Sequence, residues 1–271
     1  MIRDCRVLVD YVSNKIRDFT DIAVVGLSGG ADSTLVAALC TKALGSENVY
    51  GASMPYNKFD EETFNARSAQ VALKLGINHS IRNISAISDA IDEQIQFDKN
   101  PLKDINKGNS RSRARMCVLY GMAHSLSSVL NDKRVRVMGT GNLSEDYIGY
   151  DTKGGDALAD IFIVGELFKS EIYQLLDYFR DEGVLDEDLI CRIPSAGLED
   201  GQTDEEDLGY TYNRMESGVR YCMNHSDDGE MEYLVKSGHV DEVIKFVWGR
   251  HCANKHKHEA PPVISLRNFA D

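Results

Sequence analysis

The chain has 271 residues, of which 42% are hydrophobic and 27% charged, and it carries a formal net charge of −13 at pH 7. This size allows a buried core, and we expect one domain over residues 1–271. The acidic charge argues against a broad nucleic-acid-binding face, although it leaves room for a local basic pocket. No apolar run approaches the roughly 20 residues that cross a bilayer, so we expect no membrane segment.

Six cysteines are scattered along the chain without a CxxC pair, and the N-terminal residues lack the pattern of a signal peptide. This spacing indicates neither a disulfide framework nor a zinc site. We therefore expect reduced cysteines and a cytoplasmic protein. The six are Cys5, Cys40, Cys117, Cys191, Cys222 and Cys252.

Short β-rich runs alternate with segments of helical periodicity along the chain. The expected strands are residues 22–27 (IAVVGL), 49–54 (VYGASM), 79–84 (HSIRNI) and 135–140 (VRVMGT). Apolar residues at helical spacing fall between and after them, within 35–39, 64–75, 116–123 and 172–179. This alternation predicts a single Rossmann-like α/β domain, in which a doubly wound parallel sheet is flanked by helices on both faces.

Two segments rich in glycine and polar residues follow predicted strands. They are GLSGGADS (26–33), after the first strand, and GTGNLSED (139–146), after the fourth. In open parallel sheets the ligand binds beyond the carboxyl ends of the strands, where both segments are expected to lie. Two long polar stretches, 98–112 and 196–212, are expected to form functional loops or lids.

The segment 26–33 has the composition of a phosphate-binding loop. Its three glycines allow backbone N–H groups to approach a ligand closely, and Ser28 and Ser33 add hydroxyl donors. A helix beginning near Asp32 would add its positive end, which predicts a nest for a polyphosphate. The spacing is neither that of a Walker A loop nor GxGxxG. A strand-to-helix turn without a ligand is the alternative, in which Asp32 is a helix cap.

The string SGGxDS at 28–33 resembles the signature of the ATP pyrophosphatases, which hold the departing pyrophosphate in this loop while AMP is transferred. Further motifs follow in order, and with NSRSRARM (109–116) they closely resemble the ammonia-dependent NAD synthetases over nearly the whole chain. The resemblance implies an adenine nucleotide alpha hydrolase-like fold. The later motifs are GTGNLSEDYIGYDTKGGDALAD (139–160), ELFKSEIYQL (166–175), PSAGLEDGQTDEEDLGYTY (194–212) and HKHEAPP (256–262).

The resemblance also implies the roles of individual residues. Asp32 and Glu145 would bind Mg²⁺ and, with Lys169, carry the catalysis, and two carboxylates with phosphate oxygens do suit this cation. ATP contacts are implied for Gly26, Leu27, Ser28, Gly29, Gly30, Ala31, Asp32, Ser33, Thr140, Lys169 and Ser195. Contacts to deamido-NAD are implied for Arg113, Lys153, Asp160, His256 and Lys257.

Taken one at a time, these charged residues have ordinary explanations. Glu145 could be a solvated acid, Lys169 a lysine whose stem lies on apolar surface, and Arg113 part of a solvated basic face. The segment containing Lys153 and Asp160 could be a plain surface loop. The basic tail at 254–263 could be disordered, and its histidines lack partners at metal-ligand spacing, which predicts against a metal site there.

The resemblance implies a two-step reaction. The nicotinate carboxylate of deamido-NAD attacks the α-phosphate of ATP, and ammonia then displaces AMP to form the amide of NAD. Positioning and charge neutralisation dominate the first step. The second step needs a base, for which Asp160 or a nearby acid is the candidate. Glutamine-using relatives carry an additional amidase domain, for which 271 residues leave no room, so free ammonia is the expected substrate unless a separate subunit supplies it.

The family is typically a homodimer. Apolar positions in the helix expected at 115–130 suit either a dimer interface or a core face. The expected partners are therefore small molecules and a second copy of the chain, with neither nucleic acid nor membrane among them.

Two other functions compete with this interpretation. A related adenylating enzyme, such as a GMP-synthetase-type or tRNA-thiolating enzyme, would share the loop, but a tRNA modifier should also show a basic surface and paired cysteines. A nucleotide-binding sensor without turnover would not need a second metal ligand, so the presence of both Asp32 and Glu145 argues against it.

Overall fold

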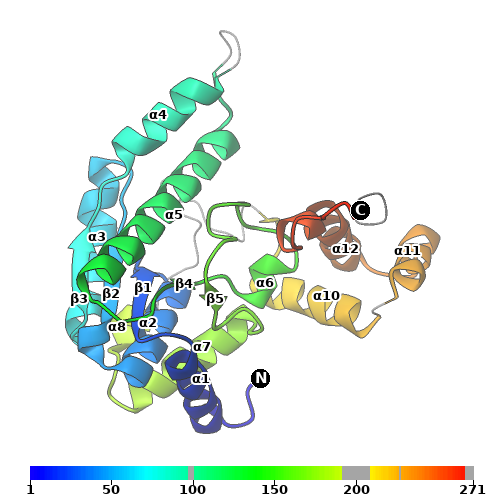
Figure 1. The fold of residues 1–271 in the computed structure, drawn as a ribbon. Helices are drawn as coiled ribbons and strands as arrows, with labels where there is room; N and C mark the ends of the chain where they lie inside the picture. The colour runs from blue at the N-terminus through cyan, green and yellow to red at the C-terminus, as the bar shows by residue number, and fades with distance from the viewer. Residues whose placement is uncertain (97–100, 191–207, 226, 266–271) are drawn as a thin grey trace, which may run out of the picture.

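A five-stranded parallel sheet forms the centre of the protein (Figure 1). The computed structural model describes residues 1–96, 101–190, 208–225 and 227–265, without the side chains of 58–65. The strand order is β3-β2-β1-β4-β5, and every pairing is parallel. The strands are β1 (Ile22–Gly26), β2 (Val49–Ser53), β3 (Asn78–Ile81), β4 (Val135–Gly139) and β5 (Ile161–Phe162).

Helices cover both faces of this sheet, which confirms the predicted doubly wound fold. On one face α1 (Cys5–Phe19), α2 (Ala31–Leu44), α3 (Lys58–Leu75) and α7 (Lys169–Asp181) contribute to an apolar core that includes Val25 and Leu39. On the other face α5 (Asp104–Val129) buries Met116, Leu119 and Ala123 against β1 and β4. These apolar positions of α5 therefore belong to the core. For the helix expected at 115–130, the sequence left a core face and a dimer interface as alternatives, and these three residues form a core face.

The stretch 98–112 was expected to be a loop, and this expectation is wrong for residues 104–112. These residues form the first turns of α5, which runs beside α4 (Ser85–Ile95) (Figure 1). Residues 104–106 are exposed, while the small residues Gly108 and Ser110 are buried and the rest of this stretch is partly buried. Residues 97–100 and 191–207 lie outside the described residues, and they include residues 196–207 of the second expected loop, 196–212.

A group of helices at the C-terminal side forms a second apolar cluster, which lies to the right of the sheet in Figure 1. It packs α10 (Tyr212–Asn224) against α12 (Glu242–Asn254) and against the short α6 (Leu143–Asp146). Because α6 directly follows β4, this packing holds the segment after β4 in place. The remaining elements are α8 (Glu187–Ile190), α11 (Asp228–Ser237) and the 3₁₀ turns η1 (Ser46–Asn48) and η2 (Lys255–Lys257).

Among the described residues, no helix combines the length and the apolar character that a bilayer crossing requires.

Candidate active site

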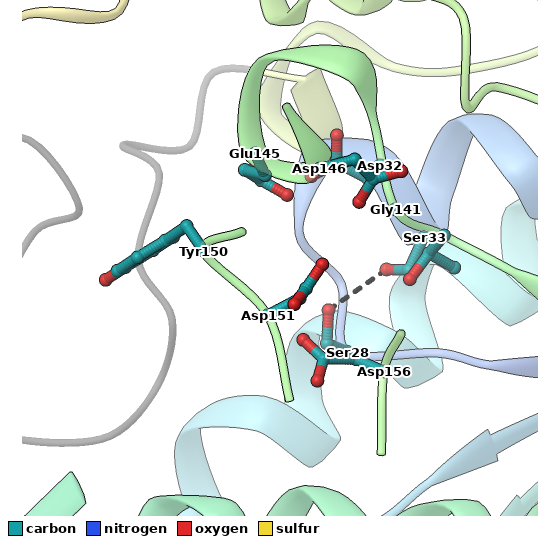
Figure 2. Close-up of a pocket in the computed structure, with 10 residues that line it drawn as sticks. Ser28, Asp32, Ser33, Gly141, Glu145, Asp146, Tyr150, Asp151 and Asp156 are labelled. Atoms are coloured by element: carbon teal, nitrogen blue, oxygen red, sulfur yellow. Dashed lines mark hydrogen bonds between the residues drawn. The ribbon is translucent and has the colours of Figure 1, made fainter. Parts of the chain in front are cut away.

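A pocket lies at the carboxyl ends of β1 and β4, between the segments that leave these two strands (Figure 2). This is the switch point of the sheet, because the chain moves from β1 to β2 on one side and later returns to β4 on the other. The location agrees with the expected position of the two glycine-rich segments. The lining residues are Ser28, Asp32, Ser33, Thr140, Gly141, Glu145, Asp146, Tyr150, Asp151 and Asp156.

The loop after β1 contributes Ser28, Asp32 and Ser33 to the lining of this pocket. Gly29 has φ of +76°, and an added Cβ would lie 3.1 Å from the backbone N of Ser68, so the position requires glycine. The Ser28 hydroxyl accepts a hydrogen bond from the Gly30 N–H at 3.1 Å and lies 3.0 Å from the Ser33 hydroxyl. Gly30 is the N-cap of α2, so the interpretation of Asp32 as a helix cap is wrong.

Asp32 and Glu145 converge on one cation. The Lys169 Nζ lies 2.6 Å from Asp32 Oδ2 and 3.0 Å from Glu145 Oε1, and the Lys169 side chain is 5% exposed. Burial acts to lower the pKa of Lys169, but the two carboxylates outweigh it and hold this pKa above its usual range. Lys169 is therefore a buried ammonium at the pocket, which excludes the alternative of an ordinary surface lysine.

Asn142 connects the two segments that carry these carboxylates. Its side chain is fully buried, donates a hydrogen bond from Nδ2 to Asp32 Oδ1 at 2.9 Å and accepts one from the Glu145 N–H at 3.2 Å. Tyr212, from α10, donates a hydrogen bond to Glu145 Oε1 at 2.9 Å. Asn142 was not predicted from the sequence, although an asparagine just ahead of an acidic helix start is a recognisable N-cap signal.

Glu216 anchors the backbone beside Glu145 and Lys169. This buried carboxylate on α10 accepts hydrogen bonds from the Ser144 hydroxyl at 3.1 Å, the Ser170 N–H at 2.9 Å and the Ser170 hydroxyl at 2.6 Å. The Ser144 hydroxyl in turn accepts from the Lys169 N–H at 3.0 Å. One side chain therefore fixes α6 and the start of α7 relative to each other.

Glu216→Ala is expected to lower the free energy of unfolding by about 3 kcal/mol, because it leaves several buried donors without an acceptor. Equilibrium urea unfolding followed by circular dichroism measures this change. Glu232→Ala is the matched control, since Glu232 is exposed and pairs with Lys236 on the same helix, and it should change stability by less than about 0.5 kcal/mol. Equal losses in both variants would contradict the anchoring role.

The structure brings four of the five residues expected to contact deamido-NAD into one chain of contacts. Arg113 Nε donates to the Lys153 carbonyl at 3.2 Å, and Lys153 Nζ donates to the His256 carbonyl at 2.5 Å. Lys257 Nζ donates to the carbonyls of Gly149 at 2.7 Å and Asp151 at 2.8 Å. The start of the basic tail is therefore folded as α12 and η2 and lies against the loop after α6.

Asp160 lies apart from this group. Its carboxylate accepts a hydrogen bond from the Val137 N–H at 2.7 Å, next to the start of β5, and receives a long one from the Tyr120 hydroxyl at 3.5 Å. Asp156, which was not predicted from the sequence, lines the pocket and accepts a hydrogen bond from the Ser112 hydroxyl at 2.8 Å. No motif spacing distinguishes Asp156 from its acidic neighbours, so only the folded loop reveals its position.

The remaining residues expected at ATP occupy different parts of this region. Thr140 follows β4 and lines the pocket, whereas the side chain of Leu27 is buried in the core, so only its backbone can face a ligand. Gly26 ends β1 and Ala31 begins α2. Ser195 lies outside the described residues.

Comparison with known proteins identifies the chain's relatives. The family described as NAD synthase matches residues 3–261. The chain belongs to the NAD synthase family. The NH(3)-dependent NAD(+) synthetase of Methanocaldococcus jannaschii is 35% identical over 265 residues, which cover 96% of each chain. The protein of the same name from Methanococcus aeolicus is 41% identical over 216 residues, 77% of this chain and 78% of that one.

Solved structures of NAD synthase relatives share the fold. The structure of NMN synthetase from Francisella tularensis superimposes with a TM-score of 0.76 at 25% identity, covering 97% of this chain and 99% of that one. The NH3-dependent NAD synthetase from Campylobacter jejuni, in complex with the nitrate ion, gives a TM-score of 0.71 at 28% identity, covering 97% and 100%. The fold and the family assignment therefore agree.

Proposed function

We propose that the protein amidates deamido-NAD to NAD with ATP and ammonia, through an adenylated deamido-NAD intermediate, and releases AMP and pyrophosphate. The observation that carries this proposal is the SGGADS loop, which includes Asp32, facing Glu145 across one pocket in a member of the NAD synthase family. The names of the curated relatives support ammonia as the nitrogen donor. This reaction makes the protein a carbon–nitrogen ligase of NAD biosynthesis.

The glycine-rich loop holds the phosphates of ATP in this proposal. Backbone N–H groups of residues 26–33 and the positive end of α2 bind the phosphate oxygens, with hydroxyls from Ser28 and Ser33. Lys169 adds a buried positive charge where negative charge accumulates on the leaving pyrophosphate. Thr140 and Ser195 complete the ATP contacts that we propose.

Mg²⁺ fits the site formed by Asp32 and Glu145. Both carboxylates line the pocket and lie close enough together to share the Lys169 ammonium, and carboxylate oxygens are the ligands that this cation prefers. When bound, Mg²⁺ would neutralise charge on the polyphosphate. Asn142 orients the Asp32 carboxylate, and Tyr212 orients that of Glu145.

Deamido-NAD binds beside the loop after α6, where Arg113, Lys153, His256 and Lys257 supply positive charge and hydrogen-bond donors for its phosphates and ribose groups.

As the base that takes the proton released in the second step, we favour Asp156 over Asp160. Asp156 lines the pocket, and the hydrogen bonds that it accepts from the Thr152 N–H and the Ser112 hydroxyl both go to Oδ1, whereas Asp160 is not among the described residues that line the pocket. Asp160 then contributes by holding the loop to β4.

We further propose that the protein is a cytoplasmic homodimer. The resemblance to the family supports the dimer, and the five described cysteines, all free, support a reducing compartment.

A second candidate substrate is the mononucleotide counterpart of deamido-NAD, because one structural relative with high overall similarity is an NMN synthetase. Incubation with ATP, Mg²⁺ and ammonium, with either deamido-NAD or its mononucleotide counterpart, separates the two candidates. NAD is followed with a coupled dehydrogenase and the mononucleotide amide by chromatography. Turnover of deamido-NAD with the higher kcat/KM supports the main proposal, whereas turnover of the mononucleotide alone overturns it.

His256→Ala is expected to raise KM for deamido-NAD about tenfold with little change in kcat, as loss of one hydrogen bond to a charged group would produce. The contacts that hold this segment use the His256 carbonyl and the Lys257 ammonium, so the fold should persist. Steady-state kinetics with varied deamido-NAD measures the change in KM. His239→Ala, just after α11, is the control and should leave KM unchanged. Unchanged KM would remove His256 from the binding site.

A further inference from the structure

Three potential metal ligands meet at the wall of the pocket. Asp146, Asp151 and His258 each offer one ligand atom, and these atoms all lie within 4.8 Å of one another. They come from the end of α6, from the loop after it and from the C-terminal segment just beyond η2. The cluster is a product of the fold, because the third ligand is more than a hundred residues away in sequence. The spacing of the histidines along the tail predicted no metal site, because that prediction did not include carboxylates from distant parts of the sequence.

Asp151 is the most unusual member of this cluster. Its side chain is 5% exposed, and among the described residues neither carboxylate oxygen receives a well-aligned hydrogen bond. Its nearest cationic groups are the His258 Nε2 at 2.6 Å and the Lys257 Nζ at 3.5 Å. Burying a carboxylate is costly unless it is paired or binds a metal ion, and the two cationic neighbours of Asp151 leave both of its oxygens without a well-aligned hydrogen bond.

The charge of the pocket supports a further cation. Five of the lining residues are acidic, and none of the ten described residues that line the pocket is basic. Figure 2 shows Asp151 lying between the turn that carries Glu145 and Asp146 and the loop that carries Ser28. A site for polyphosphates needs positive charge, and an ion at Asp32 and Glu145 would leave Asp146 and Asp151 with His258 and Lys257 as the cationic groups beside them.

The ligand set indicates which kind of ion would bind. Mg²⁺ prefers oxygen ligands, which the pair Asp32 and Glu145 provides. An imidazole nitrogen with two carboxylates suits first-row transition metals such as Zn²⁺, Co²⁺ or Mn²⁺. Three protein ligands also leave a position open for water or a phosphate oxygen, as in catalytic metal sites.

We propose that Asp146, Asp151 and His258 form a binding site for a divalent first-row transition metal, separate from the Mg²⁺ site at Asp32 and Glu145. An ion at this site joins the C-terminal segment to α6 and closes the pocket beside Lys257. All three residues lie at or next to the pocket to which the proposed function assigns the phosphate groups. The metal site stands on its own residues and does not require the proposed reaction.

Titration with Co²⁺ tests this site in the full-length protein. The protein is first stripped with a chelator and then titrated in excess Mg²⁺, which occupies oxygen-only sites, while visible absorption and calorimetry record binding. We expect one Co²⁺ to bind per chain and to show the ligand-field absorption bands of a Co²⁺ ion with a low coordination number. His258→Ala and Asp151→Asn should each weaken Co²⁺ binding at least about tenfold, because even loss of an outer partner of a metal ligand has that effect.

His124→Ala, on the exposed surface of α5, is the matched control and should bind Co²⁺ like the unmodified protein. The His258 side chain is one-third exposed, so its truncation should leave the circular dichroism spectrum unchanged and isolate the loss of a ligand. No Co²⁺ binding in excess Mg²⁺, or unchanged binding in His258→Ala, overturns the proposal. NAD formation with Mg²⁺ alone is measured separately, so failure of the metal site and failure of the proposed reaction remain distinguishable.

Discussion

Asp32→Asn is expected to lower kcat for NAD formation at least about a thousandfold while the protein stays folded. A bound divalent cation contributes several kcal/mol to stabilising transition-state charge, and about 4 kcal/mol corresponds to that factor. The amide preserves an oxygen that can accept the hydrogen bond from Asn142, and Lys169 keeps Glu145 as its partner. Steady-state kinetics at saturating ATP, with circular dichroism on the same sample, measures both parts of this result.

Asp10→Asn is the matched control, because Asp10 lies exposed on α1 and the substitution removes the same charge. It should leave kcat unchanged. Raising the Mg²⁺ concentration should recover little activity in Asp32→Asn if the ligand is lost outright. A variant with near-normal kcat would show that Asp32 is not a metal ligand in the reaction.

Lys169→Met is expected to lower both stability and activity. Removing the ammonium leaves the carboxylates of Asp32 and Glu145 close together without their shared partner. Breaking a buried ion pair costs several kcal/mol, and we expect up to about 3 kcal/mol here because both carboxylates retain some exposure. Loss of a fixed positive charge at the leaving group should also lower kcat at least about a hundredfold.

Urea unfolding with and without Mg²⁺ distinguishes the two contributions of Lys169. Without Lys169 the two carboxylates should bind Mg²⁺ more tightly, so the cation should restore part of the lost stability. Lys236→Met, which breaks an exposed pair with Glu232, should change stability by less than about 1 kcal/mol. If Lys169→Met matched this control in both stability and kcat, the buried ammonium would have neither role.

The sheet and its glycine-rich edge could be predicted from the sequence because their signals are local. Buried parallel strands produce short continuous apolar runs, as in residues 22–27, and the chain must turn sharply where glycines follow them. All four predicted strands are present in the structure, and that of residues 79–84 is shifted to Asn78–Ile81. The motifs that carry the family resemblance are equally local, because each is a short continuous stretch of the chain.

The features that the sequence did not reveal depend on tertiary contacts. β5 has only two residues, too few for a periodic signal, and it exists because Met138 and Gly139 pair with it. The polar residues 104–112 resemble a loop in composition, but α4 packs beside them in a helical hairpin. Glu216 and Asp151 are separated in sequence from the groups that they contact, so no spacing rule could assign them.

The most direct test of the central claim is the full product balance of one reaction. The protein is incubated with ATP, Mg²⁺, ammonium and deamido-NAD, and all nucleotides and phosphate products are quantified together. If the pocket activates the nicotinate carboxylate by adenylation, NAD, AMP and pyrophosphate appear in equal amounts. Formation of ADP and phosphate in their place, or the absence of NAD beside an active control enzyme, would contradict the account.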